Sequence, residues 1–173
     1  MSSTTVNLGI GIFSFEYSSN DGSTWTKIEN IVEGSMAFTF TDPTETNLNV
    51  EDKADPIATL RSKDTPDRID LAFYNLSAAE LVVLAGGVAT GESWASPIST
   101  PLITLAIKIK TQAFNGYYVT YTIHKAQILG KFAGAPTKKQ AEQFNVSCII
   151  QAYSLNNNAS APFTRLVTSG TPS

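Results

Sequence analysis

The sequence predicts a mainly β fold: a single β-sandwich or incomplete barrel with one short α-helix and a long loop between its early strands. Three observations lead to this prediction. Apolar and polar residues alternate along several runs, short turn sequences separate neighbouring runs, and one segment carries helix-capping signals. Since 173 residues suit one ordinary domain, we expect 1–173 to fold as a single unit.

The first three strands are expected in the N-terminal quarter of the chain. The run 8–17 is rich in Ile and Phe, and Asp21-Gly22 follows it as a hairpin turn. A return strand is expected over 24–31. A third strand is expected over 36–41, where Met and Phe alternate with Ala and Thr.

The segment 42–66 is acidic and interrupts this pattern. It contains Pro43, Pro56 and Pro66, and proline cannot donate to a central sheet ladder. Only 46–50 alternates enough to predict a short strand. A long loop of this kind in a compact domain is usually functional or disordered, so it is a candidate for interaction.

A strand over 68–74 leads into the one predicted helix. Ser77 is the expected N-cap, and Glu80 three residues later completes a capping box. Gly86-Gly87 can adopt the left-handed conformation that ends a helix. The helix side expected to lie on a sheet is formed by Leu76, Leu81 and Leu84.

The second half of the chain continues as strands. The turn sequence Asn115-Gly116 predicts a second hairpin. The expected elements are a loop at 88–101, strands at 102–110, 117–123, 126–132 and 144–155, a helical turn at 138–142, and a C-terminal tail at 156–173.

Charge is scarce and unevenly distributed. Charged residues make up 16% of the chain, and the net charge of −3 argues against a protein built to grip nucleic acid. Residues 1–60 carry a net charge of −7 and residues 61–173 a net charge of +4. Either the two parts attract each other between copies, or they mix on one surface.

A long stretch without charge has two readings as well. No residue from Gln143 to Thr164 is charged. An uncharged strand at an exposed sheet edge invites pairing with another chain, so assembly would close that edge. The alternative is that these strands are central in the sheet.

The sequence shows no catalytic or metal-binding pattern, so we expect neither an enzyme nor a cofactor. His124 is the only histidine, and Cys148, the only cysteine, lies in an apolar run that predicts a buried, inert thiol. The acidic residues of 42–66 lack the spacing of a calcium loop. The tryptophans Trp25 and Trp94 suit core or interface packing, or a sugar-binding platform.

The order of elements resembles the tail tube proteins of long-tailed bacteriophages. The resemblance is carried by the sequence from Asp64 to Ser77, which runs from a strand into a short helix that ends at Gly86-Gly87. The early hairpin, the proline-bearing segment 42–66 and the later strand pairs are also similar to that family, so the resemblance spans most of the chain.

Membership of that family would imply a sandwich-like domain that forms rings, usually hexamers, whose inner sheets join into a barrel. Stacked rings form a tube through which double-stranded DNA passes without specific binding, and excess negative charge in the lumen would prevent sticking. The long loop, the N-terminal segment and the tail would bridge rings. The implied inter-subunit residues are Asp42, Glu45, Glu51, Asp52, Asp55, Arg61 and Lys63. The lumen candidates from strand alternation are Glu16, Thr120 and Thr122.

The same resemblance implies copies of this chain as partners, together with tape measure, terminator and baseplate proteins. We expect no membrane partner, and we expect manufacture in the host cytoplasm and a final place in the virion. The alternatives are a head–tail joining or tail terminator protein, a monomeric carbohydrate-binding module using Trp25 or Trp94, and an enzyme using His124 or Cys148.

Overall fold

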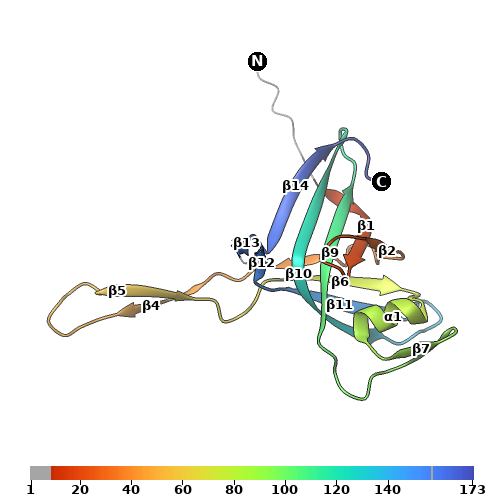
Figure 1. Cartoon of the computed structure of the whole chain (residues 1–173), viewed down its shortest axis with the longest axis horizontal. Coiled ribbons are helices and arrows are strands. Elements are labelled where there is room, and N and C mark those ends of the chain that lie inside the picture. Colours follow the sequence, from red (N-terminus) through yellow and green to blue (C-terminus); the bar gives the residue numbers. More distant parts are fainter. Residues whose placement is uncertain (1–8, 157) are drawn as a thin grey trace.

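The computed structural model describes residues 9–156 and 158–173, and it confirms the mainly β fold with one helix (Figure 1). Eight strands form one sheet in the order β2-β1-β9-β10-β11-β6-β3, with β14 added on β10. Across the described residues this sheet does not close into a barrel. It bends into a sandwich-like body, and three small two-stranded ribbons accompany it.

The first layer of the body consists of five strands. They are β2 (Thr26–Ile28), β1 (Ile10–Ser18), β9 (Ile103–Gln112), the first half of β10 (Tyr117–Gly134) and β14 (Phe163–Ser169). All neighbours are antiparallel. Both predicted hairpin turns are confirmed, because Asp21, Gly22, Asn115 and Gly116 all have positive φ angles, as tight hairpin turns require.

The second layer consists of the second half of β10, β11 (Gln143–Ile150), β6 (Arg68–Tyr74) and the short edge strand β3 (Ala37–Thr39). Strand β10 belongs to both layers because it is one strand of 18 residues, where the sequence predicted two. His124 and Lys125 form a bulge opposite a single β9 residue, between the pairs Ile123–Ile107 and Ala126–Leu105. A bulge bends a strand, so β10 leaves β14 there and continues beside β11.

The core lies between the two layers. The Phe15 ring of β1 contacts the Phe73 ring of β6 edge-to-face, with 5.2 Å between centroids. Ile107 and Ile109 of β9 and Val146 of β11 are fully buried beside them. In β6 and β9 the alternating apolar residues Ile69, Leu71, Phe73, Ile107 and Ile109 are buried, as the period of two requires.

The predicted helix is confirmed as α1 (Ala78–Ala85), with Ser77 and Glu80 forming a complete capping box. Leu81 and Leu84 are buried against the sheet. Gly130 of β10 allows this close approach, since a Cβ atom there would lie 2.7 Å from the Leu84 carbonyl oxygen.

Several predicted boundaries were wrong. The predicted loop at 88–101 contains a small hairpin, β7 (Val88–Thr90) with β8 (Ser93–Ala95). The expected helical turn at 138–142 is instead an isolated bridge between Thr137 and Gln140. The strands expected over 24–31 and 36–41 are shorter, and Leu8, where the first strand was expected to begin, lies outside the described residues.

The expected tail at 156–173 is also wrong. The long strand predicted to reach residue 155 ends at Ile150, and β12 (Tyr153–Leu155) then pairs with β13 (Asn158–Ser160). Strand β14 follows and pairs with β10 over seven residues. Apolar residues occur on both faces of β14, so its sequence shows no clear alternation that would predict a strand.

Candidate assembly surfaces

Residues 42–66 form an arm that projects from the body, on the side away from α1 and β7 (Figure 1). Its two strands, β4 (Thr44–Leu48) and β5 (Ala58–Ser62), pair antiparallel over five residues. The segment was predicted as an excursion with a short strand over 46–50; the strand instead spans Thr44–Leu48, and β5 was missed. Since a lone two-stranded ribbon is at best marginally stable in water, this arm gains from a partner.

The arm has one apolar and one polar face. Cross-strand partners share a face, which places Leu48 and Leu60 together on one side. Leu48 is 43% exposed and Leu60 is 55% exposed. On the other face Thr59 donates a hydrogen bond to Asn47 at 2.8 Å. The exposed apolar face is the feature that points to an occupant.

All seven inter-subunit candidates lie on the arm and are exposed. Glu45 and Arg61 form an ion pair of 2.6 Å on the polar face. Lys63 pairs at 2.6 Å with Asp67, at the root of the arm. The remaining four candidates are acidic residues without a salt bridge among the described residues: Asp42, Glu51, Asp52 and Asp55.

Sequence reasoning selected the charged residues of the arm and missed its apolar ones. The sequence did contain a signal for an exposed apolar surface. Leu48 and Leu60 lie in a segment that is mostly polar and too short to form a core of its own. Only the register of β4 against β5 shows that the two leucines share a face.

The outer face of the first layer is polar and collects the three lumen candidates. One row across four strands contains Glu16, Lys108, Thr122 and Thr164, each directly opposite the next. Thr120 lies in the adjacent row, opposite Lys110. The sheet therefore brings Glu16, Thr120 and Thr122 to one surface, as the alternation predicted.

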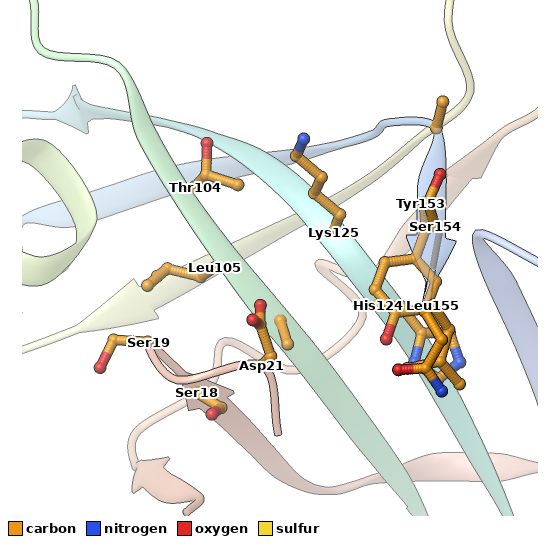
Figure 2. Close-up of a pocket in the computed structure, with 13 residues that line it drawn as sticks. Ser18, Ser19, Asp21, Thr104, Leu105, His124, Lys125, Tyr153, Ser154 and Leu155 are labelled. Atoms are coloured by element: carbon orange, nitrogen blue, oxygen red, sulfur yellow. The ribbon is translucent and has the colours of Figure 1, made fainter. Parts of the chain in front are cut away.

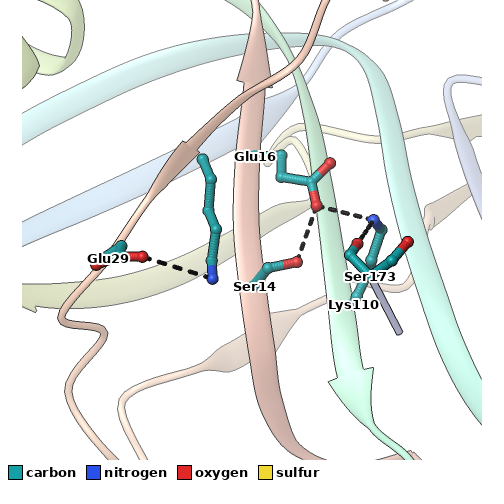
Figure 3. A network of polar contacts seen from close by, with 6 residues as sticks. Ser14, Glu16, Glu29, Lys110 and Ser173 are labelled. Carbon is teal, nitrogen blue, oxygen red and sulfur yellow. Dashed lines mark hydrogen bonds and ion pairs between the residues drawn. The ribbon is translucent and has the colours of Figure 1, made fainter. Parts of the chain in front are cut away.

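Glu16 is held in a network rather than exposed on this face (Figure 3). Its carboxylate accepts a hydrogen bond from the Ser14 hydroxyl and pairs with the Lys110 ammonium, each at 3.0 Å. Lys110 also donates to the Ser173 backbone oxygen at 2.6 Å. Residues after β14 therefore reach across to β9 on this face. Thr120 and Thr122 are half-buried beside the network.

The polar face is not acidic, in contrast to the lumen charge that the resemblance implied. It holds the lysines Lys27, Lys108 and Lys110 against Glu16 and Glu29. Two of these lysines pair with a carboxylate that offsets their charge: Lys27 with Glu29 and Lys110 with Glu16. Of the net charge of −7 on residues 1–60, −4 lies on the arm, at 42–60.

The third lysine, Lys108, stacks on an aromatic ring. Its ammonium lies 3.8 Å from the centroid of Trp25, a favourable cation–π contact. Burial lowers the pKa of Lys108, the nearby Glu16 carboxylate opposes this shift, and the nearby Lys110 adds to it. A ring face covered in this way does not offer a free platform for a sugar.

The second tryptophan is also occupied. The Trp94 Nε1 atom donates to the Gly86 carbonyl oxygen at 2.8 Å, and its ring contacts Phe132. Trp94 thus fastens β8 to the end of α1. Both tryptophans therefore pack against other side chains, which is one of the two roles that the sequence suggested for them.

Strand β14 lies at an edge of the first layer. Among the described residues it pairs only with β10, so its outer row of backbone groups has no strand beside it. It carries one charged residue, Arg165, over seven positions. Long edges with little charge are templates for pairing with another chain. The other edge of this layer is β2, which has only three residues.

A polar cleft of about 490 Å³ lies where the β1–β2 turn, the β10 bulge and β12 meet (Figure 2). The His124 ring stacks on Tyr153 with 4.9 Å between centroids, and Asp21 and Lys125 also line the cleft. Cys148 is not among its lining residues. The cleft therefore does not bring together the nucleophile and base that the enzyme alternative requires.

Cys148 is fully buried between Ile69 of β6 and Ile128 of β10, as predicted. Burial, with a contribution from the Asp70 carboxylate, raises the pKa of this thiol far above its usual value. Within residues 9–156 and 158–173 no cluster of three or more His, Cys, Asp or Glu side chains is placed to hold a metal ion. In the same residues no helix has the length and apolar character needed to span a membrane.

The chain matches no protein-family model and no curated protein.

Proposed function

We propose that this chain is a structural subunit of the tail tube of a long-tailed bacteriophage, which assembles into stacked rings around a conduit for double-stranded DNA. The single observation that supports the proposal most strongly is the arm, whose apolar face is left exposed by the residues that the structure describes. A surface of this kind is stabilised when a second copy covers it. Six copies per ring follow from the resemblance, and tape measure, terminator and baseplate proteins are the further partners.

The two edge strands of the first layer could pair between neighbouring subunits of a ring. Strand β14 of one subunit beside the β2 edge of the next would extend one sheet around the ring, and would cover the open backbone groups. A head-to-tail contact of this kind closes when the rotation between copies divides a full turn.

The polar face of the first layer is the proposed lumen wall. This face would offer the passing DNA little positive charge to bind. It carries uncharged threonines, Lys27 and Lys110 are paired with carboxylates, and Lys108 is stacked on Trp25. The acidic arm would then lie outside the lumen and contact neighbouring rings.

Negative-stain electron microscopy across a concentration series tests this function. We expect hollow tubes or stacked rings whose length grows with protein concentration, while a joining or terminator protein would stop at one ring. Small particles of one size at every concentration, also after addition of preformed tube fragments as seeds, would count against the proposal.

A matched pair of variants connects the outcome to the arm. Leu60→Glu places a charge on the apolar face, and Thr59→Glu places the same charge on the polar face one residue away. Tubes should disappear in the first variant and persist in the second, with both bodies folded. Equal behaviour of the two variants would remove the arm from the assembly.

A further inference from the structure

The root of the arm lacks a continuous sheet ladder. Pairing of β3 with β6 ends at Thr39 and Arg68, and pairing of β4 with β5 begins at Thr44 and Ser62. Pro43 and Pro66 stand in the interval, and neither can donate a backbone hydrogen bond. The ladder therefore does not by itself fix the direction in which the arm leaves the body.

One carboxylate bridges this interval. Asp67 Oδ1 accepts a hydrogen bond from the backbone N–H of Thr41 at 3.0 Å, on the segment that enters the arm. Asp67 Oδ2 accepts a hydrogen bond from the Lys63 ammonium at 2.6 Å, on the segment that leaves the arm. Each carboxylate oxygen thus holds one of the two segments that connect the arm to the body.

Asp67 is itself fixed to the body. Its carbonyl oxygen accepts a hydrogen bond of 2.8 Å from the N–H of Ile150, the last residue of β11. The next residue, Arg68, begins β6 in the body sheet. A side chain on such an anchored backbone can transmit the orientation of the sheet to the arm.

The aromatic contacts at the root are less directional, and they include the stacking of Phe40 on Phe38 with 5.9 Å between centroids. The Phe40 ring lies 5.5 Å from the Phe163 ring of β14, and Phe40 is 50% exposed. Aromatic packing tolerates rotation and sliding, whereas two hydrogen bonds to one carboxylate specify an angle. From this geometry we infer that Asp67 is a positioning residue that sets the direction of the arm relative to the body.

The consequence for assembly rests on the proposed function. An arm held in one direction loses less conformational freedom when it docks on a neighbouring copy, so docking is stronger. A loosened arm should still fold and still carry its apolar face, but tubes should need more protein to form.

Distances between spin labels in the unassembled protein test the inference without relying on tubes. Labels at Thr59→Cys on the arm and Lys131→Cys on the body, in a Cys148→Ala background, report the arm direction. The distance distribution should be about two-fold wider in Asp67→Ala than in the parent protein. Asp67→Asn keeps an acceptor for Thr41 but loses the ion pair with Lys63, and should give an intermediate width.

The matched control is Asp70→Ala. Asp70 likewise forms an ion pair, with Arg68 at 3.1 Å, but it lies on the body sheet opposite Ala37, and among the described residues its carboxylate makes no hydrogen bond or ion pair with residues 40–66. Its distribution should equal that of the parent. A parental width in Asp67→Ala, or equal broadening in both variants, would overturn the inference.

A second variant keeps the test decisive if Asp67→Ala fails to fold. Lys63→Met removes the ion pair with Asp67 and leaves the Asp67–Thr41 hydrogen bond intact. The distance distribution should therefore broaden in part, and an unchanged width would refute the inference. If the parent protein forms no tubes at all, the proposed function fails, while the distances still decide the role of Asp67.

Discussion

Glu16 and Lys110 form an ion pair of 3.0 Å on the polar face of the first layer, with side chains only 12% and 16% exposed. The same carboxylate accepts a hydrogen bond from the hydroxyl of Ser14, which is buried. A pair this sheltered differs from a surface salt bridge, because removing one member leaves the other with little water to replace it.

Replacing Glu16 should therefore destabilise the fold. Glu16→Gln keeps the shape but removes the charge that faces Lys110, and we expect a loss of about 1–3 kcal/mol in the free energy of unfolding. Urea denaturation measures it. Glu29→Gln is the control, since its pair with Lys27 spans 3.7 Å and its side chain is 74% exposed. A loss for Glu16 no larger than that for Glu29 would contradict the prediction.

Gly130 should not tolerate a side chain. A Cβ atom there would lie 2.7 Å from both the Leu84 carbonyl oxygen and the Phe144 ring. Overpacking of this kind costs about 1–3 kcal/mol, so Gly130→Ala should lower the melting temperature. Gly134→Ala on the same strand meets its nearest atoms at 3.6 Å and should melt like the parent. Equal melting of the two variants would show that α1 can move away from β10.

The edge role of β14 predicts a hydrogen-exchange pattern. In the unassembled protein, amides on the outer side of β14 should exchange rapidly, and they should become protected when tubes form. Strand β11 provides an internal control, because it has β10 on one side and β6 on the other and should be protected in both states. Rapid exchange in β14 after assembly would mean that its edge is not a subunit contact.

Acid should release the root of the arm only at low pH. Burial alone would raise the pKa of Asp67, but hydrogen bonds from Lys63 and Thr41 and the charge of Lys63 outweigh it and hold the pKa below the ordinary value of 3.8. A carboxyl whose pKa is lowered by folding contributes stability above its unfolded value, and this contribution is lost as the pH falls through the folded value.

An NMR titration of the Asp67 carboxyl checks this directly. Its midpoint should lie below 3.8, and Lys63→Met should raise it, because the largest lowering contribution comes from Lys63. A midpoint that does not change in Lys63→Met would mean that the ion pair does not hold the carboxylate in solution.

Local patterns predicted most of the body. The alternation in β6 and β9 identified the buried faces, the Ser77–Glu80 capping box identified α1, and Asp-Gly and Asn-Gly identified both hairpin turns. Each of these signals acts over a few neighbouring residues, where the period of two, a cap or a positive φ angle is decided by residue type alone.

Elements that depend on partners far along the chain were missed. Strand β14 has no alternating pattern and forms because Tyr117–Ile123 of β10 offers it a ladder. The two strands predicted over 117–123 and 126–132 form one strand, β10. The reason is that β10 pairs with β9 on both sides of the bulge at His124. Pairing over such separations follows from the whole sheet, and local propensity does not encode it.

The sequence by itself determined the class of fold, the one helix, the projecting segment 42–66 and the burial of Cys148. Only the tertiary structure decided which face of the arm is apolar, where Glu16 finds Lys110, and how Asp67 joins Thr41 to Lys63. The physical reason is that the order of side-chain types along one strand determines which of its faces is buried. The contacts named above depend instead on the register between strands, which brings together residues that are far apart in the sequence.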